Sequence, residues 1–157
     1  MSKHYRLNVA ALIFRLKADG KLQLLLGRRR DFPSCWQWPQ GGVDEGESLE
    51  EAFHREVFEE TGLKNLHIVA KIAKPIRYEF NEEGRKKFKP YKGQEQVYFI
   101  AKIPDGEPTA DHLDSVKNKE FTELKWKNPT LAVKTAPAFK AKAYKNALKG
   151  LEKLSLA

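Results

Sequence analysis

Residues 41–63 read GGVDEGESLEEAFHREVFEETGL, an acidic, glycine-bounded segment in a chain whose formal net charge is +8. Ser48 is a good helix N-cap, and Glu51 three residues later completes a capping box. Gly62 stands where a helix would end in a left-handed residue. The segment therefore predicts a helix over residues 49–61.

The acidic residues of this predicted helix do not all lie on its polar side. Its apolar face is formed by residues at helical spacing, namely Leu49, Ala52, Phe53 and Val57. Glu56 and Glu60 fall inside that face, and Glu59 lies at its edge. An unpaired carboxylate in a half-buried strip is costly or becomes neutral. Unless the glutamates form only an exposed face beside an apolar ridge, they need a cation, and Mg²⁺ with its preference for oxygen ligands is the natural one.

Other residues of the segment fit the same interpretation. Arg55, four residues before Glu59, can hold a carboxylate by a charge-assisted bond and aim it at a metal, although an ordinary helix pair has the same spacing. Gly41 and Gly42 lack side chains, so backbone carbonyls there can approach an ion closely. Glu47, just before the helix, can reach the same region.

The composition is that of a soluble globular protein. Hydrophobic residues make up 41% of the 157 residues, and the apolar run at 9–14 is far too short to span a membrane. The single cysteine, Cys35, excludes an intrachain disulfide and suits a reducing compartment, so we expect a cytoplasmic protein with one domain over residues 1–157. The excess of positive charge is typical of a surface that attracts phosphates, and equally of one kept soluble by lysines.

The order of elements predicts an α/β (α+β) protein with a mixed sheet. Strands are expected at 5–16, 22–26, in one or two pieces of 67–80 broken near Pro75, at 96–103 and at 121–127. A last helix is expected at 137–154, with several lysines on one side. Residues 31–42 and 81–93 are rich in proline, glycine or polar residues, which favours loops. One acidic helix between strands and one C-terminal helix indicate helices packed on the faces of a sheet.

The acidic segment matches the Nudix box at every fixed position. The matching residues are Gly41, Glu47, Arg55, Glu56, Val57, Glu59, Glu60, Gly62 and Leu63. The chain thus resembles the Nudix hydrolase family. This resemblance implies the Nudix fold, an α/β/α sandwich with the box as a loop-helix-loop, and Mg²⁺- or Mn²⁺-dependent hydrolysis of a nucleoside diphosphate linked to another group. The implied metal ligands in the box are Gly41, Glu56, Glu59 and Glu60.

Segments outside the box resemble the group that contains bacterial RNA pyrophosphohydrolases and asymmetric diadenosine tetraphosphate hydrolases. These segments are residues 5–9, 36–42, 93–96, 119–121 and 138–140. Two positions depart from the group. Leu7 replaces its usual proline, and Glu95 replaces its usual lysine, which removes a positive charge near the site.

The same resemblance implies roles for residues in these segments. Glu120 is carried over as a further metal ligand. Phe139 is implied to stack on the first or second base, and Lys140 to meet the nucleotide. Gln40 and Gln94 lie in matching segments and are expected to bind the substrate.

Further candidates follow from residue chemistry. Arg29 suits a phosphate, although three arginines in a row also suit a solvated strand end, and Tyr78 is a second ring for base stacking. Residues 85–92 interleave basic and aromatic side chains, which favours an RNA backbone contact or simple solvation. Either Glu60, which we favour, or Glu120 would take the proton of the attacking water. The predicted catalytic set is Arg55, Glu56, Glu59, Glu60 and Glu120.

Three functions remain open at this point. The first is an RNA 5′ pyrophosphohydrolase that turns 5′-triphosphate or 5′-diphosphate ends into 5′-monophosphate ends. The second is a hydrolase of diadenosine tetraphosphate or similar small nucleotides. The third is a Nudix domain that binds nucleotide or RNA without catalysis, which the intact set of Arg55, Glu56, Glu59 and Glu60 disfavours. The expected partner is therefore 5′-phosphorylated RNA or a dinucleoside polyphosphate, and not a membrane.

Overall fold

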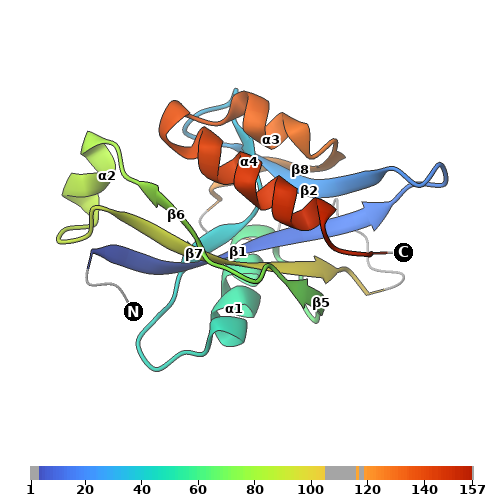
Figure 1. Ribbon diagram of the computed structural model, residues 1–157, viewed down its shortest axis with the longest axis horizontal. Helices are drawn as coiled ribbons and strands as arrows, with labels where there is room; N and C mark the ends of the chain where they lie inside the picture. Colours follow the sequence, from blue (N-terminus) through green and yellow to red (C-terminus); the bar gives the residue numbers. More distant parts are fainter. Residues whose placement is uncertain (1–3, 105–115, 117–118, 157) are drawn as a thin grey trace.

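The computed structural model describes residues 4–104, 116 and 119–156, which are organised around a mixed sheet. The strands are β1 (Tyr5–Leu16), β2 (Leu22–Arg29), β3 (Trp36–Gln37), β4 (Gln40–Gly42), β5 (His67–Lys71), β6 (Ile76–Glu79), β7 (Gly93–Lys102) and β8 (Phe121–Lys127). The helices are α1 (Leu49–Thr61), α2 (Glu82–Lys87), α3 (Thr130–Thr135) and α4 (Ala138–Glu152). Figure 1 shows α1 on one side of the sheet and α3 and α4 on the other, which confirms the predicted sandwich.

β1 is the centre of the sheet because three strands pair with it. β7 runs parallel to β1, from the Tyr5–Gly93 pair to the Ile13–Ala101 pair. β2 and β4 run antiparallel to β1. β2 also pairs with β3 and β8, and β7 with β5 and β6, so every strand joins the sheet through β1 or one of its neighbours.

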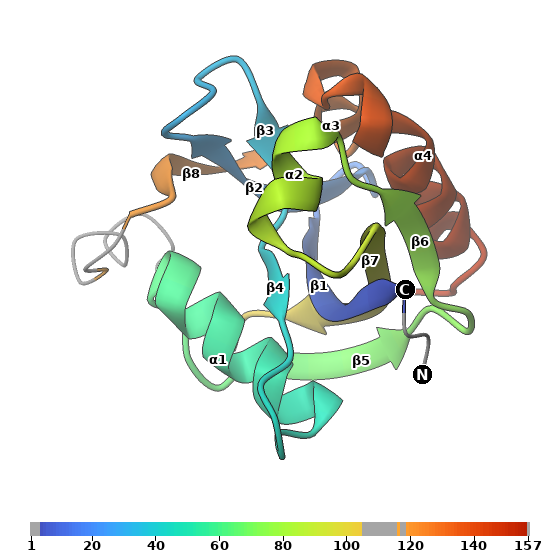
Figure 2. The same cartoon turned by 90° about the vertical axis from the view of Figure 1, so that its left-hand side faces the viewer.

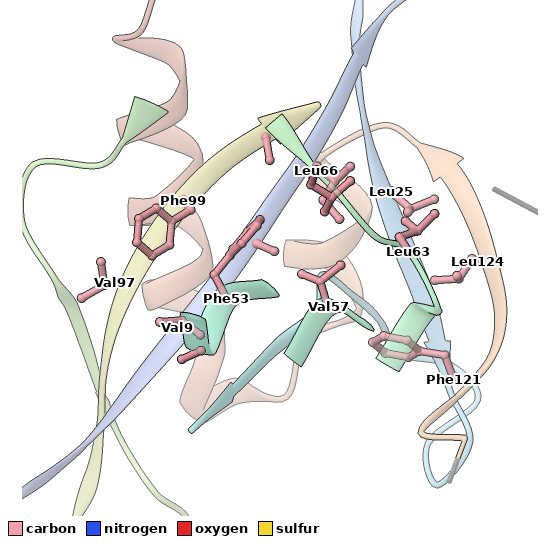
Figure 3. Packing of buried hydrophobic residues seen from close by; sticks show 14 of the residues in the cluster. Val9, Leu25, Phe53, Val57, Leu63, Leu66, Val97, Phe99, Phe121 and Leu124 are labelled. Carbon is pink, nitrogen blue, oxygen red and sulfur yellow. The ribbon is translucent and has the colours of Figure 1, made fainter. Parts of the chain in front are cut away.

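Side chains of β1 alternate between two buried clusters, one on each face of the sheet. Toward α1 the cluster contains Val9, Ala11 and Ile13 with Phe53 and Val57 of the helix (Figure 3). Toward α4 it contains Ala10, Leu12 and Phe14 with Tyr144 and Leu151 of the helix. Burial of both faces explains why this part of β1 is an unbroken apolar run. It also fixes the register, because a slip of one residue would send every side chain to the other face.

α1 begins and ends where its capping pattern predicts. The Ser48 hydroxyl accepts a hydrogen bond from the N–H of Glu51 at 3.1 Å, and the Glu51 carboxylate accepts one from the N–H of Ser48 at 3.0 Å. Gly62 has a φ of 77°, and its N–H donates to the carbonyl of Phe58 at 2.8 Å. A residue with a Cβ would be strained in that left-handed conformation.

Two segments predicted as loops contain regular structure. Within residues 31–42, β3 pairs with β2 and β4 pairs with β1. These short strands form because neighbouring strands offer them hydrogen-bond partners, which the local sequence does not encode. Within residues 81–93, Asn81 caps α2 and accepts a hydrogen bond from the N–H of Gly84 at 3.0 Å.

Other predicted boundaries were confirmed or needed extension. β8 has the predicted bounds, and β5 and β6 lie on either side of Pro75, as predicted. β2 continues to Arg29 because its last residues pair with β3 and β8. β7 begins at Gly93 rather than Gln96, and α3 was not predicted. Within the described ranges, no helix has both the length and the apolar character needed to cross a membrane.

Replacing Ser48 with Ala should lower the free energy of unfolding by about 1 kcal/mol, because α1 then loses the side-chain acceptor of its cap. Urea denaturation followed by circular dichroism measures this change. Ser155→Ala is the control, because Ser155 is exposed and lies beyond α4. Equal unfolding midpoints for the two variants would contradict the role of the cap.

Candidate active site

The three glutamates in the second half of α1 differ in exposure as their helical positions predict. Glu56 and Glu60, inside the apolar face, are more buried than Glu59 at its edge. Glu60 is 4% exposed and accepts a hydrogen bond from the backbone N–H of Gln40 at 3.3 Å. Burial, aided by repulsion from Glu120 and Glu56, raises the pKa of Glu60 well above its ordinary value. Glu56 is partly buried, and burial is also the main cause that raises its pKa. The side chain of Glu59 is 56% exposed.

Arg55 gathers acidic side chains and a backbone carbonyl around its guanidinium group. It donates to Glu47 at 2.7 and 2.9 Å and to Glu56 at 2.7 Å. Glu59 lies 3.3 Å away, and the carbonyl of Gly42 accepts a hydrogen bond at 2.8 Å. Hydrogen bonding to Arg55 lowers the pKa of Glu47 to about 2. The predicted contact with Glu59 is therefore present, but the shorter contacts tie the loop before α1 to Glu56.

Gly41 brings the backbone of β4 against Glu56. A Cβ added at Gly41 would overlap the Glu56 carboxyl group, so a larger residue would push the strand away from the helix. Gly41 is held in this place by its pairing with Val9 of β1. Backbone and carboxylate oxygens brought together in this way fit a hard divalent cation, which prefers oxygen ligands.

Glu120 reaches the site from the segment just before β8. It directly precedes β8, and its backbone carbonyl accepts a hydrogen bond from the N–H of Arg30 at 2.8 Å. It lines the same pocket as Glu56, and its charge adds to the rise in the pKa values of Glu56 and Glu60. Among the described residues, no three aspartate, glutamate, histidine or cysteine side chains form a close cluster. Gathering these carboxylates around one ion therefore requires rotation of side chains.

The residues predicted to bind substrate line one pocket of about 770 Å³ beside these carboxylates. They are Arg29, Gln40, Tyr78, Gln94, Phe139 and Lys140. Further cations lining it are Arg6, Arg30, Lys87 and Lys119. A pocket lined by both carboxylates and cations suits an anionic substrate that binds together with a metal ion.

Tyr78 lines this pocket with a ring that is largely buried, so its role in base stacking stays a prediction. It is 7% exposed, and its hydroxyl accepts a hydrogen bond from Gln94 at 3.1 Å. Burial raises its pKa to about 12. Phe139 and Ala143 of α4 cover the ring, with the Phe139 ring centre 5.9 Å from that of Tyr78. Phe139 is partly exposed and remains the ring available to a base.

Lys140 and Arg29 place positive charge in the pocket. Lys140 is 7% exposed, and burial, followed by the charge of Arg29, lowers its pKa to about 8. Arg29 donates to Asp31 at 2.8 Å and to Gln37 at 3.4 Å. A buried ammonium group beside another cation is costly unless an anion offsets it, and a phosphate group would do so.

Glu95, where the related group carries lysine, does not change the charge of the pocket. Its carboxylate accepts a hydrogen bond from Arg77 at 2.8 Å. Glu95 is also not among the described residues that line the pocket. The expected loss of positive charge at the site therefore does not occur.

Known proteins resemble this chain in sequence. The NUDIX domain family model matches residues 4–147. The RNA pyrophosphohydrolase of Nitratiruptor sp. is 36% identical over 151 residues, which cover 96% of each chain. That of Campylobacter jejuni is 33% identical and covers 96% of this chain and 94% of its own. This chain belongs to the Nudix family. Members of this family hydrolyse pyrophosphate linkages and generally need a divalent metal ion.

Solved Nudix structures share the fold. The dihydroneopterin triphosphate pyrophosphohydrolase of E. coli matches with a TM-score of 0.65 and 21% identity, covering 92% of this chain and 97% of its own. The C. elegans Ap4A hydrolase in its binary complex matches with a TM-score of 0.64 and 23% identity, covering 95% and 99%. At these identities the likeness concerns the fold alone.

The Nudix pocket also has a wall that the sequence did not reveal. Figures 1 and 2 together place α2 at the end of the sheet where β1 and β7 begin. Phe88 follows α2 and lines the pocket, stacked on Phe80 at 5.1 Å between ring centres. The Arg6 guanidinium lies 4.7 Å over Phe88 and donates to Gln94 at 3.2 Å. The mixture of basic and aromatic residues at 85–92 was the available signal.

Replacing Glu60 with Gln should lower kcat about a hundredfold or more if Glu60 acts in the reaction, because a charged group is lost where charge develops. The metal-free variant should also be more stable than wild type at neutral pH. The sign follows from the raised pKa: above the unfolded value, the fold opposes ionisation of Glu60 and loses stability. Glu50→Gln, on an exposed part of α1, is the control for both kcat and urea denaturation. Full turnover of Glu60→Gln with Mg²⁺ would exclude the role.

Lys140 should make stability depend on pH in the alkaline range. Its pKa in the fold is about 8, against an ordinary 10.5, so between these values the unfolded chain binds more protons. The stability of wild type relative to Lys140→Met should therefore rise with pH in this window, by up to about 1.4 kcal/mol per pH unit. Urea denaturation of both proteins from pH 7 to 10.5 measures the difference, and parallel curves would refute it.

Proposed function

We propose that this protein is an RNA 5′ pyrophosphohydrolase, which converts 5′-triphosphate or 5′-diphosphate RNA ends into 5′-monophosphate ends. The observation that carries this proposal is that Glu56 of α1 and Glu120 line the same pocket as Lys140 and the partly exposed Phe139. Relatives named RNA pyrophosphohydrolase, which align with nearly the whole chain, support it. A cytoplasmic setting is part of the proposal and fits the single Cys35.

Mg²⁺ is the proposed metal, and Mn²⁺ is expected to substitute for it. The proposed ligands are Glu56, Glu59, Glu60, Glu120 and the backbone of Gly41. When bound, the ion lowers the pKa of water and offsets negative charge on the phosphates. Arg55 contributes by fixing the carboxylate of Glu56 through its 2.7 Å contact, as second-layer partners of metal ligands commonly do.

Glu60 is the proposed general base. One of its carboxylate oxygens accepts the N–H of Gln40, which leaves the other to accept a proton from the attacking water. Its raised pKa brings its proton affinity closer to that needed near neutral pH. Glu120, which lines the pocket, is the alternative base.

Substrate binding is assigned to other residues of the pocket. Arg29 and Lys140 are proposed to bind phosphate oxygens, because both present positive charge there. Phe139 is proposed to stack on the first or second base, an interaction worth about 1–3 kcal/mol. Gln40 and Gln94 line the pocket between these groups and supply polar contacts.

A hydrolase of diadenosine tetraphosphate is the second candidate. It would use the same carboxylates and the same stacking ring, Phe139, since such a dinucleotide also ends in a base attached to a polyphosphate. A sensor without catalysis is disfavoured, because binding alone does not require Arg55 together with the three glutamates of α1.

Direct competition separates the two enzymes. A short 5′-triphosphorylated RNA and diadenosine tetraphosphate are supplied at equal low concentration with Mg²⁺, and kcat/KM is measured for each from product release. We expect the RNA to be preferred, with pyrophosphate or phosphate released and a 5′-monophosphate left. Preference for the dinucleotide would replace the proposed function with the second candidate. Tight RNA binding without product release under any metal would indicate the sensor.

A further inference from the structure

A chain of buried amide groups runs from the core of the sheet to the edge of the pocket. The hydroxyl of Tyr98 donates to Oε1 of Gln96 at 3.0 Å. Nε2 of Gln96 donates to Oδ1 of Asn8 at 2.9 Å and to Oε1 of Gln40 at 3.3 Å. Asn8, Gln96 and Tyr98 are each no more than 1% exposed. Asn8 and Gln40 both line the pocket.

This series of hydrogen-bonded side chains leaves one donor, Nδ2 of Asn8, without a partner in the described part of the protein. No acceptor among the described residues forms a hydrogen bond with Nδ2 of Asn8. A buried donor left unpaired is unfavourable, so folded proteins contain few of them. An amide at this position therefore costs stability in the free protein, and a partner supplied from the pocket would recover it.

The orientation of the Asn8 amide is fixed by the rest of the chain. Because Tyr98 donates to the oxygen of the Gln96 amide, the nitrogen of that amide must face Asn8 and Gln40. Asn8 accordingly turns its oxygen toward Gln96 and its nitrogen away. The amide thus presents a donor rather than an acceptor on its free side.

The surroundings of Asn8 indicate which acceptor fits. Its backbone pairs with Gly42 of β4, the residue whose carbonyl is held by Arg55. A Cβ added at Gly42 would overlap the guanidinium of Arg6, so a cation lies directly beside this position. Donors and cations gathered here call for an anionic oxygen. The bases are expected further away, at the ring of Phe139.

We propose that Asn8 is a substrate-binding residue whose Nδ2 donates to an oxygen of the substrate's phosphate chain. Gln96 and Tyr98 are positioning residues, because their hydrogen bonds hold Oδ1 of Asn8 toward Gln96 and leave Nδ2 without a partner among the described residues. This inference rests on the proposed function in one respect, since it requires a substrate with a phosphate chain. It assigns roles to Asn8 and Gln96, which lie in the flanking segments 5–9 and 93–96 but received no role from the sequence.

Asn8→Asp tests the contact with the least change in shape. The variant keeps the oxygen that accepts from Gln96 and replaces the donor with a second oxygen, which repels phosphate. Affinity is measured with Mg²⁺ by fluorescence anisotropy for one RNA sequence carrying either a 5′-hydroxyl or a non-hydrolysable 5′-triphosphate with methylene bridges. We expect binding of the triphosphate form to weaken about tenfold or more, and binding of the hydroxyl form to change less than about twofold.

Gln96→Leu tests the positioning role in the same assay. It should reduce the preference for the triphosphate form in the same direction as Asn8→Asp, because the Asn8 amide is then free to rotate. Gln23→Leu is the matched control, since the Gln23 amide accepts a hydrogen bond from the exposed Arg15 and is not among the described residues that line the pocket. Equal losses for both RNA forms would show a structural role only and overturn the proposal, as would no loss for either.

A measurement on the wild-type protein covers the case in which the variants fail to fold. The side-chain amide of Asn8, observed by NMR in protein labelled with ¹⁵N-asparagine, should shift when the triphosphate analogue binds and not when the 5′-hydroxyl RNA binds. An unmoved signal means that the amide does not contact the substrate, and it refutes the inference.

Failure of this inference is distinguishable from failure of the proposed function. If wild type cleaves triphosphorylated RNA and Asn8→Asp binds it as wild type does, only the role of Asn8 is wrong. If wild type prefers diadenosine tetraphosphate, the proposed function is wrong. The same comparison of variants, made with a methylene-bridged dinucleotide analogue, then decides the role of Asn8.

Discussion

The guanidinium group of Arg55 is the contact on which the acidic end of this molecule depends. Glu47, Glu56 and Glu59 all lie within 3.3 Å of it, and without it their like charges would repel one another. Its bond to the carbonyl of Gly42 ties the same group to β4. One cation therefore sets both the direction of the carboxylates and the position of the backbone that faces them.

Glu60 shows the other side of this arrangement. Arg55 bonds to the carboxylates of Glu47 and Glu56, whereas the deeper Glu60 accepts a hydrogen bond from the N–H of Gln40. The charges are thus unequally neutralised, which explains why the pKa of Glu47 falls and that of Glu60 rises. Residues of one short segment thereby acquire different chemical properties, because Arg55 bonds to Glu47 whereas burial dominates at Glu60.

The sequence predicted the parts of this site that local rules determine. α1 was predicted to the residue because Ser48, Glu51 and Gly62 act within one turn of the helix ends. The burial of Glu60 followed from helical periodicity. β3 and β4 were not predicted, because they exist only through pairing with strands elsewhere in the chain.

The same distinction explains what the sequence did not reveal at the substrate side of the pocket. The side chain of Tyr78 follows the alternation of β6. Its ring is covered by Phe139 and Ala143 of α4, which lie far along the chain from β6. Phe88 and Arg6 meet only because the fold brings the segment after α2 to the start of β1. Contacts of this kind are set by tertiary packing, and no pattern within a short window encodes them.

The parallel pairing of β1 with β7 has a consequence for how the protein forms. Asn8 and Gln96 are 88 positions apart, as are Arg6 and Gln94. Closing so long a loop costs chain entropy before any contact repays it, so this pairing is expected to be a slow step of folding. During synthesis, more than half of the sequence must leave the ribosome before β7, the parallel neighbour of β1, is available for pairing. The hydrophobic first strand is then exposed to aggregation for longer than any later one.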